Sequence, residues 1–368
     1  MWNCLQREMK ILFYRRRMVF IVLIAAASAY ALLIGTLYQN QTVQQIPVMV
    51  CDLNQSALSR QVVQDIASAD QYRFLGTVNS EEEGQKQLAS QNAAVVVVIP
   101  RDFSENYYAG RPVSLAFLQN GTNTLVAGYA LPPMQSVWAA WAGQHRAYGN
   151  MIHNTPWLSL AGVRLDLRYT ANPVQSYLSF YVYGVMLIAA QIGIMMGYAL
   201  SVQDDVRHGF YRRHGFGRVM AVKVLFYWTL SFISVLVGIV VLAAIFHLPF
   251  RGPLWQILSL CAVFLLAVEN LAGLIALYFR TRLALVQCLV FYTLPAFLLS
   301  GYIWPVQAMP GVIHCISLLQ PVHYALSDFR QLALSGTAGG YAFHMAVLVS
   351  MAFLSCIMTG TVIWYRQK

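Results

Sequence analysis

Six apolar stretches, each long enough to cross a lipid bilayer as a helix, constrain this chain more than any other feature. The hydrocarbon core of a bilayer is about 30 Å thick, which a helix of roughly 20 residues spans. Composition agrees, because 58% of the 368 residues are hydrophobic and only 10% are charged, whereas soluble domains carry about 25% charged residues. The sequence therefore predicts an α-helical integral membrane protein with six transmembrane helices. The stretches are residues 18–38, 177–202, 219–247, 254–279, 283–304 and 342–365.

Basic residues are concentrated in alternate connections between these stretches. Fourteen of the 24 lysines and arginines fall on one side if both termini are cytoplasmic, together with only three acids. The positive-inside rule therefore predicts that the N and C termini face the cytoplasm. The net charge of +10 is mostly this asymmetry and comes with no nucleic-acid-binding motif, so nucleic acid is not an expected partner. The basic residues are Arg7, Lys10, Arg15, Arg16, Arg17, Arg207, Arg212, Arg213, Arg218, Lys223, Arg280, Arg282, Arg366 and Lys368, and the acids are Glu8, Asp204 and Asp205.

The only polar region of domain size lies between the first two stretches, at residues 39–176, and the predicted topology places it outside the cytoplasm. Strand-like and helix-like patterns alternate along it, which is typical of a small α/β sheet with right-handed crossover connections. Residues 122–153 then turn helical, with an expected interruption at Pro132 and Pro133. The expected strands are 45–52, 72–78, 93–100 and 113–121, and the expected helices are 54–70, 80–91 and 101–110.

No catalytic or metal-binding motif stands out in this region. The sequence has no G-x-S-x-G or H-E-x-x-H motif, and His145 and His153 have no third ligand nearby. Three consecutive acids, Glu81 to Glu83, open a predicted helix, where the helix dipole favours negative charge. The chain also lacks G-x-x-x-x-G-K-[ST], and none of its four lysines follows a glycine, so it has no phosphate-binding loop for ATP. We expect a binding or docking module rather than an enzyme, with no bound metal or cofactor.

Two further segments differ from plain spanning helices. The basic, amphipathic residues 1–17 predict a helix lying at the membrane interface, with a simple anchoring flank as the alternative. Residues 305–336 are apolar but carry Pro305, Pro310 and Pro321, each of which disfavours helix just before it. Backbone at membrane depth must be buried in protein or line a cavity. We therefore expect two short re-entrant helices that dip into the outer leaflet; an ordinary loop is the alternative, and the apolar content argues against it.

The same segment carries the motif that points to a family. Its sequence SGYIWPVQAMPGVIHCISLLQPVHYALSDFRQLALSG resembles the C-terminal signature of ABC type-2 exporter permeases: Ser-Gly, Pro, Met-Pro, Leu-x-Pro, an aromatic residue, an Arg and a closing Gly. The outer region resembles the periplasmic domain of the bacterial drug-exporter-like members in VMVCDLNQSALSRQVVQDI, VVVVIPRDFSENYYAGRPVSLAFLQNGTNT and RYTANP. The signature residues that the resemblance assigns to an outer gate are Ser300, Gly301, Pro305, Met309, Pro310, Pro321, Tyr324 and Arg330.

The resemblance covers the whole chain and implies its architecture and partners. In this family the permease is one half of a dimeric pore in the bacterial inner membrane, driven by a separate cytoplasmic ATPase that binds ATP and Mg²⁺. The resemblance implies export of an amphiphilic substrate (drug-like, lipid or glycolipid) from the cytoplasm or inner leaflet. The implied partners are that ATPase, a second permease copy or a paralogue, the lipid bilayer, a periplasmic adaptor and an outer-membrane channel.

The resemblance also assigns the connection at 203–218, QDDVRHGFYRRHGFGR, to a coupling helix that contacts the ATPase. The family has Glu-Arg-Glu-x-Gly-Thr there, then an acid, leucines and a proline. Alignment on Gly209 places Asp205 at the first acid, but Arg207 replaces the second, Phe210 replaces the threonine, and the proline is missing. Three interpretations stay open: weakened coupling, a surface for a divergent ATPase, or a basic flank for lipid headgroups. The expected coupling residues are Asp204, Asp205, Arg207, His208, Gly209, Arg212 and Arg213.

An acid inside the fourth apolar stretch is the remaining polar signal. Glu269 and Asn270 fall near the bilayer midplane, where a charged side chain facing lipid costs at least about 2.5–3.5 kcal/mol. Glu269 should therefore face the dimer interface, the transport path or a polar neighbour such as Gln287 or Gln191. A structural hydrogen bond and a pathway role are both open. The candidate pathway residues are Glu269, Asn270 and Gln287.

Two alternatives to a working exporter permease are kept. The first is a non-transporting membrane scaffold or receptor built on the same fold, which the atypical coupling loop favours. The second is the degenerate half of a heterodimeric permease. The expected division of the chain is an interfacial helix at 1–17, a first transmembrane helix at 18–38, a periplasmic α/β domain at 39–176 and five further transmembrane helices at 177–368.

Overall fold

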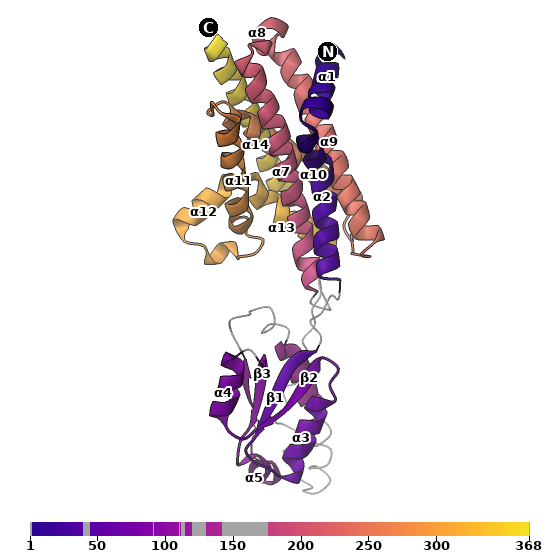
Figure 1. The fold of residues 1–368 in the computed structure, drawn as a ribbon, viewed down its shortest axis with the longest axis vertical. Helices are drawn as coiled ribbons and strands as arrows, with labels where there is room; N and C mark the ends of the chain where they lie inside the picture. The colour runs from indigo at the N-terminus through magenta and orange to yellow at the C-terminus, as the bar shows by residue number, and fades with distance from the viewer. Residues whose placement is uncertain are drawn as a thin grey trace. The chain divides into compact units, whose positions relative to one another are not determined.

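The structure is a computed structural model that describes residues 2–39, 45–90, 92–109, 111, 115–119, 130–141 and 176–367. The chain divides into two compact units (Figure 1). The helical unit comprises Met1–Gln41 and Tyr169–Lys368, and the sheet unit comprises Thr42–Arg168. The two histidines that the sequence offered as a weak metal-site candidate, His145 and His153, lie outside the described residues.

Six helices of the helical unit, among the residues that the structure describes, are long and apolar enough to cross a membrane. The prediction of six helices of spanning length is confirmed. They are not equally enclosed: 83% of the most apolar window of α7 and 61% of that of α10 is buried, against 22–28% in the other four. Helices α7 and α10 are therefore the centre of the bundle, and the other four present apolar faces outward. The six are α2 (Arg17–Leu37), α7 (Tyr177–Arg207), α9 (Phe216–Ala244), α10 (Leu254–Ala276), α11 (Arg282–Leu299) and α14 (Tyr341–Gln367).

Short helices lie at both ends of this bundle (Figure 1). The end that holds both chain termini carries a helix with a π-helical extension before α2, and a one-turn helix between α7 and α9. These are α1 (Trp2–Lys10), η1 (Ile11–Arg15) and α8 (Phe210–His214). The opposite end carries the proline-rich segment as η3 (Val306–Ala308), α12 (Gly311–Leu318) and α13 (Pro321–Ser335).

The three prolines of that segment each begin a helical element. Pro305 and Pro310 precede η3 and α12 as their N-caps, and Pro321 is the first residue of α13. Proline is favoured at the start of a helix because its missing N–H would have no helical partner there. The prolines therefore divide one apolar run into separate short helices.

Where the structure describes it, the sheet unit holds a four-stranded sheet with helices packed on it. Its strand order is β2-β1-β3-β4, in which β1 runs parallel to β2 and β3, while β4 runs antiparallel to β3. The alternating pattern predicted crossover connections throughout, but the connection from β3 to β4 is not one, because a crossover joins two parallel strands. The elements are β1 (Ile46–Asp52), α3 (Ala57–Ala67), β2 (Tyr72–Val78), α4 (Glu81–Ala89), β3 (Val95–Ile99), α5 (Phe103–Tyr108) and β4 (Ala116–Gln119).

Two hydrophobic clusters account for this layering. Successive side chains of a strand point to opposite faces, and every residue of β3 is buried. On one face Val48 and Val50 pack with α3, α5 and the helix at 130–141, and on the other Cys51 and Val96 pack with α4. Helices on both faces explain why the central strand reads as an unbroken run of valine.

One expectation for this unit is wrong. Residues 130–141 are continuously helical, so Pro132 and Pro133 do not interrupt a helix there. Proline fixes its own φ at about −65°, which is a helical value, so neither proline forces its own residue out of helical geometry. The remaining residues of the predicted helical region 122–153 lie outside the described part of the chain.

Candidate functional site

The coupling turn, residues 203–218, reverses the chain between α7 and α9. Helix α7 ends at Arg207, α8 forms a single turn, and a glycine with positive φ stands at each junction: Gly209 at 62° and Gly215 at 80°. A residue with a Cβ is strained in this left-handed region. The two glycines therefore allow the angles at which α8 leaves α7 and enters α9.

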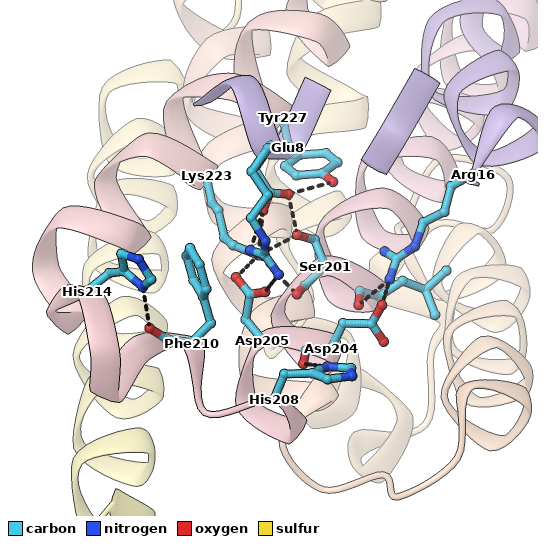
Figure 2. A network of polar contacts seen from close by, with 12 residues as sticks. Glu8, Arg16, Ser201, Asp204, Asp205, His208, Phe210, His214, Lys223 and Tyr227 are labelled. Atoms are coloured by element: carbon cyan, nitrogen blue, oxygen red, sulfur yellow. Dashed lines mark hydrogen bonds and ion pairs between the residues drawn. The ribbon is translucent and has the colours of Figure 1, made fainter. Parts of the chain in front are cut away.

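A buried lysine is the centre of a polar network at this turn (Figure 2). Lys223, two turns into α9, is 1% exposed, and its Nζ lies 2.5 Å from Asp205 Oδ2 and 3.3 Å from Glu8 Oε1. The same ammonium donates hydrogen bonds to the carbonyl oxygen (3.0 Å) and the hydroxyl (2.5 Å) of Ser201. Ser201 Oγ donates to Glu8 Oε2 at 2.7 Å, and Tyr227 Oη donates to the same oxygen at 3.3 Å. One cation thus joins α1, α7 and α9 in a site closed to water.

Helix α1 is held to the turn by a second, half-buried ion pair. Arg7 Nη2 donates to Asp205 Oδ1 at 2.6 Å, and its guanidinium lies 3.8 Å from the centroid of the Phe210 ring. Burial lowers the pKa of Arg7, but the hydrogen bond to Asp205 and the charges of Asp205 and Glu8 outweigh it and leave that pKa raised. Two enclosed acids are therefore matched by two cations, which is the condition under which charges tolerate burial.

Tyr211 closes this network from α8. Its side chain is 1% exposed. Burial raises the pKa of the Tyr211 phenol well above its ordinary value, and the carboxylates of Asp205 and Glu8 raise it further. The phenol therefore stays protonated and adds no charge to the network.

Asp204 forms a separate anchor one residue earlier in α7. It pairs with Arg16, which stands between η1 and α2 and also donates to the Leu200 carbonyl at 3.2 Å. Arg282, the first residue of α11, donates to the same carboxylate through Nε (3.1 Å) and Nη2 (2.9 Å). Asp204 thus ties the starts of α2 and α11 to the end of α7 by charge-assisted bonds. The coupling network, as the term is used below, comprises Arg7, Glu8, Arg16, Ser201, Asp204, Asp205, Lys223 and Arg282.

The outer surface of the coupling turn is basic, whereas its two acids point inward. Asp205 is enclosed and Asp204 is half-buried, so neither offers a free carboxylate to a docked protein, and both position the turn instead. Sequence reasoning expected the interfacial segment at residues 5–17 to transmit ATP-driven closure together with the turn, which includes Arg7, Glu8 and Arg16, but it did not predict their partners. It gave no such role to Ser201, Lys223 or Arg282; the one signal was a lysine inside an apolar stretch, where a charge needs a partner. The exposed side chains of the turn include Arg207, His208, Arg212, Arg213 and His214.

At the opposite end of the helical unit, Arg330 joins the proline-rich segment to α7. Its Nη1 donates to the Tyr302 carbonyl at 3.1 Å, and its guanidinium lies 4.3 Å from the Tyr302 ring and 4.6 Å from the Phe180 ring. Tyr302, 2% exposed, donates from Oη to the Phe180 carbonyl (2.5 Å) and accepts from the Gly184 N–H (3.1 Å). Arg330 therefore clamps the loop after α11 between α13 and α7.

The other predicted gate residues shape the same segment. Ser300, 1% exposed, ends α11, and its Oγ accepts from the Tyr302 N–H at 3.2 Å. Gly301 follows with a φ of 80°. Tyr324 Oη donates to the Leu318 carbonyl at 2.9 Å and so links α13 to α12. The residues at the bends before η3, α12 and α13 are Pro305, Met309, Pro310 and Pro321.

Glu269 is fully enclosed in α10, and both of its carboxylate oxygens lack a hydrogen-bond partner in the part of the chain that the structure describes. Asn270, 3% exposed, donates to the Leu266 carbonyl of its own helix at 2.9 Å. Gln191 of α7 is buried with neither end of its amide paired among the described residues, whereas Gln287 is exposed on α11. Glu269 therefore forms no hydrogen bond with Gln287 or Gln191, and the other two alternatives, the dimer interface and the transport path, stay predictions.

Comparison with known proteins covers both the coupling turn and the proline-rich segment. The family model described as "ABC-2 family transporter protein" matches residues 16–361. The "Probable multidrug ABC transporter permease YbhS" of Escherichia coli (strain K12) is 25% identical over 297 residues, which are 77% of this chain and 76% of the relative. The "Probable multidrug ABC transporter permease YbhR" of the same organism is 22% identical over 299 residues, 78% of this chain and 77% of the relative.

Proposed function

Since this chain belongs to the ABC-2 family of transporter proteins, we propose that it is the permease subunit of an ATP-driven exporter of amphiphilic substrates. As a member of this family it is a multi-pass membrane protein that works in ABC transport. The relatives carry the name of multidrug permeases, which supports drug-like molecules as the substrate class, with lipids and glycolipids as chemically similar cargo. We propose that substrate enters from the cytoplasm or the inner leaflet and leaves outward.

The coupling network is the observation that carries this proposal. It connects an exposed, basic turn to α1, α2, α9 and α11 through buried or half-buried ion pairs centred on Lys223, Asp204 and Asp205. A push on α8 would therefore move the interfacial helix and these spanning helices together, which is how a rigid-body transition is transmitted. ATP and Mg²⁺ would bind to a separate ATPase subunit docked on the turn, since this sequence has no phosphate-binding loop.

The proposal places both termini and the coupling turn in the cytoplasm of a bacterium and the sheet unit in the periplasm. Helices α12 and α13 would re-enter the outer leaflet and form an outer gate that Arg330 holds to α7. A second permease copy or a paralogue would complete the pore against the outward apolar faces of the bundle. The sheet unit would deliver substrate to a periplasmic adaptor and an outer-membrane channel.

Reversing the charge of the turn should remove the ATPase. In the variant Arg212→Glu/Arg213→Glu we expect at least a roughly tenfold loss of the co-purified ATPase, because placing like charges across an interface costs several kcal/mol. The measurement is a pull-down of the tagged chain from membranes in mild detergent, with partners identified by mass spectrometry and vanadate-sensitive ATP hydrolysis assayed on the eluate. Both side chains are exposed, so the thermal unfolding midpoint should not change.

The matched control is Arg60→Glu/Lys86→Glu, which makes the same change of charge on exposed residues of the sheet unit. It should retain the ATPase. Equal loss in both variants would show a general effect of charge and not a docking surface. Recovery of the unaltered chain with no ATPase at all would reject the exporter and favour a non-transporting scaffold or receptor.

Glu269→Gln should leave export nearly unchanged. The amide has the shape of the carboxyl group, and no partner of the carboxylate among the described residues is lost by the replacement. We expect efflux of a fluorescent amphiphilic dye to stay within about twofold of the unaltered protein, a change of less than 1 kcal/mol. A drop of about tenfold or more with unchanged assembly would show that the charge or the proton of Glu269 takes part in transport.

A further inference from the structure

A hollow beside the coupling network is lined by more basic side chains than its acidic side chains can neutralise. It has a volume of about 940 Å³ and lies between α1 with η1 on one side and the ends of α7 and α11 on the other. Five arginines and lysines line it, against a single carboxylate, that of Asp204. The lining residues are Asn3, Gln6, Arg7, Lys10, Ile11, Tyr14, Arg15, Arg16, Asp204, His208 and Arg282.

The charges of this hollow are not balanced by the residues that the structure describes. Asp204 is shared by Arg16 and Arg282, while Lys10 and Arg15 form no ion pair among the described residues. The side chain of Arg16 is only 10% exposed, yet its Nη1 is buried without a hydrogen-bond partner in the part of the chain that the structure describes. A buried, unpaired guanidinium N–H among excess cations indicates a site for an anion.

The position of the hollow indicates which anion. Arg16 directly precedes α2, and Arg282 is the first residue of α11, so both stand where a spanning helix leaves the apolar core of a bilayer. Lipid phosphates lie at this depth. The exposed side chains of Phe13, Tyr14 and Met18 on the same segment are typical of a surface that contacts lipid and not bulk water.

A second hollow extends the first one with apolar walls. It has a volume of about 630 Å³ and shares Gln6, Lys10 and Tyr14 with the basic hollow. Its remaining lining residues are Met9, Phe13 and Arg17. The basic hollow thus offers cations for a phosphate, and the second hollow offers an apolar surface for the start of an acyl chain. A free phosphate or a nucleotide would leave that apolar surface empty.

We propose that these joined hollows bind one anionic phospholipid of the leaflet on the coupling-turn side, with its phosphate among Lys10, Arg15 and Arg16. A lipid in this place touches α1, α7 and α11 at once. It would therefore brace the interfacial helix against the bundle next to the coupling network, four of whose residues line the hollow. That bracing would regulate coupling only if the proposed exporter function holds, whereas the lipid site itself does not depend on it.

The test measures lipid binding to the purified full chain, stripped of native lipid in a neutral detergent. Dioleoylphosphatidylglycerol is titrated in parallel with zwitterionic dioleoylphosphatidylcholine and with inorganic phosphate, and bound lipid is counted by native mass spectrometry alongside the thermal unfolding midpoint. We expect one retained phosphatidylglycerol and a raised midpoint, with neither effect from phosphatidylcholine or phosphate. No ATPase is needed, so failure of the exporter proposal would leave this result unchanged.

Lys10→Gln/Arg15→Gln should weaken phosphatidylglycerol binding by roughly tenfold or more, since each basic residue strengthens attraction to anionic lipid about fivefold. The matched control is Arg218→Gln/Arg280→Gln, which removes two exposed basic residues outside both hollows and should bind as the unaltered chain does. Equal weakening in both variants would overturn the proposal in favour of a diffuse basic surface. Equal stabilisation of the unaltered chain by phosphatidylcholine or by phosphate alone would overturn it without any variant.

Discussion

Replacing Lys223 with methionine should destabilise the helical unit by about 3–5 kcal/mol, the cost of leaving a buried charge without its partner. Methionine fills a similar volume, so the loss reflects charge and not a cavity. Without the ammonium, Glu8 and Asp205, each 1% exposed, share Arg7 as their one remaining cation among the described residues. At roughly 2–4 °C per kcal/mol for a unit of this size, the thermal unfolding midpoint in detergent should fall by about 10 °C.

Arg218→Met is the matched control for this prediction, because it removes a cation from an exposed position on the same helix. Its midpoint should not move. The double variant Lys223→Met/Asp205→Asn should recover part of the loss, since it leaves Arg7 and Glu8, 3.3 Å apart, as a balanced pair. If the double variant were as unstable as the sum of the two single ones, Lys223 and Asp205 would not be coupled, and the network would not be the centre of this site.

The spanning helices were predictable because a bilayer imposes a length. About 20 apolar residues are needed whatever the tertiary contacts, so the stretch expected at 254–279 contains the observed helix Leu254–Ala276, and that at 18–38 nearly coincides with Arg17–Leu37. The strands of the sheet unit follow from a similar local constraint. A run such as Val95–Ile99, buried on both faces, reads as a central strand from composition alone.

The coupling network was not predictable in the same way, because its partners are far apart in the chain. Arg7 and Asp205 are separated by 198 positions, and Ser201 and Glu8 by 193. No spacing rule joins them. Lys223 was grouped with the basic residues of a cytoplasmic connection, although it lies within the apolar stretch 219–247. A charge at that place needs a partner from another helix. The sequence therefore indicates that a buried acid pairs with Lys223, but not which acid it is.

The direction in which Gln287 points was not predictable for a different reason. The side of a helix that faces the bundle can be inferred only when its polar and apolar residues separate onto different faces. Helix α11 is apolar nearly all round, so its sequence does not indicate whether Gln287 points toward Glu269 or away from it. The structure places it on the exposed side. The carboxyl group of Glu269 was correctly located inside an apolar helix, but its surroundings depend on the packing of α7 against α10.

Arg330→Ala should reduce export by roughly tenfold or more while leaving membrane insertion intact. The replacement removes a charged hydrogen bond to the Tyr302 carbonyl, a contact worth about 1.5–3 kcal/mol, and stacking on Phe180 and Tyr302 worth about 0.5–2 kcal/mol for each ring. The loop after α11 would keep the bonds of Tyr302 to α7 but lose its link to α13, so a movement of α7 would be passed less completely to α13 and α12. The measurement is dye efflux at matched amounts of protein in the membrane.

Two further replacements separate the clamp from a general effect of charge. Arg251→Ala removes an exposed arginine from the connection before α10, a connection that is itself bonded to α13 through backbone N–H groups, and should export normally. Arg330→Lys keeps the charge but not the planar group that stacks on both rings, and should fall between Arg330→Ala and the unaltered protein. If Arg330→Ala exported at the full rate, apolar packing of α13 against α7 and α10 would be sufficient to carry the movement, and the gate would have to be sought away from Tyr302.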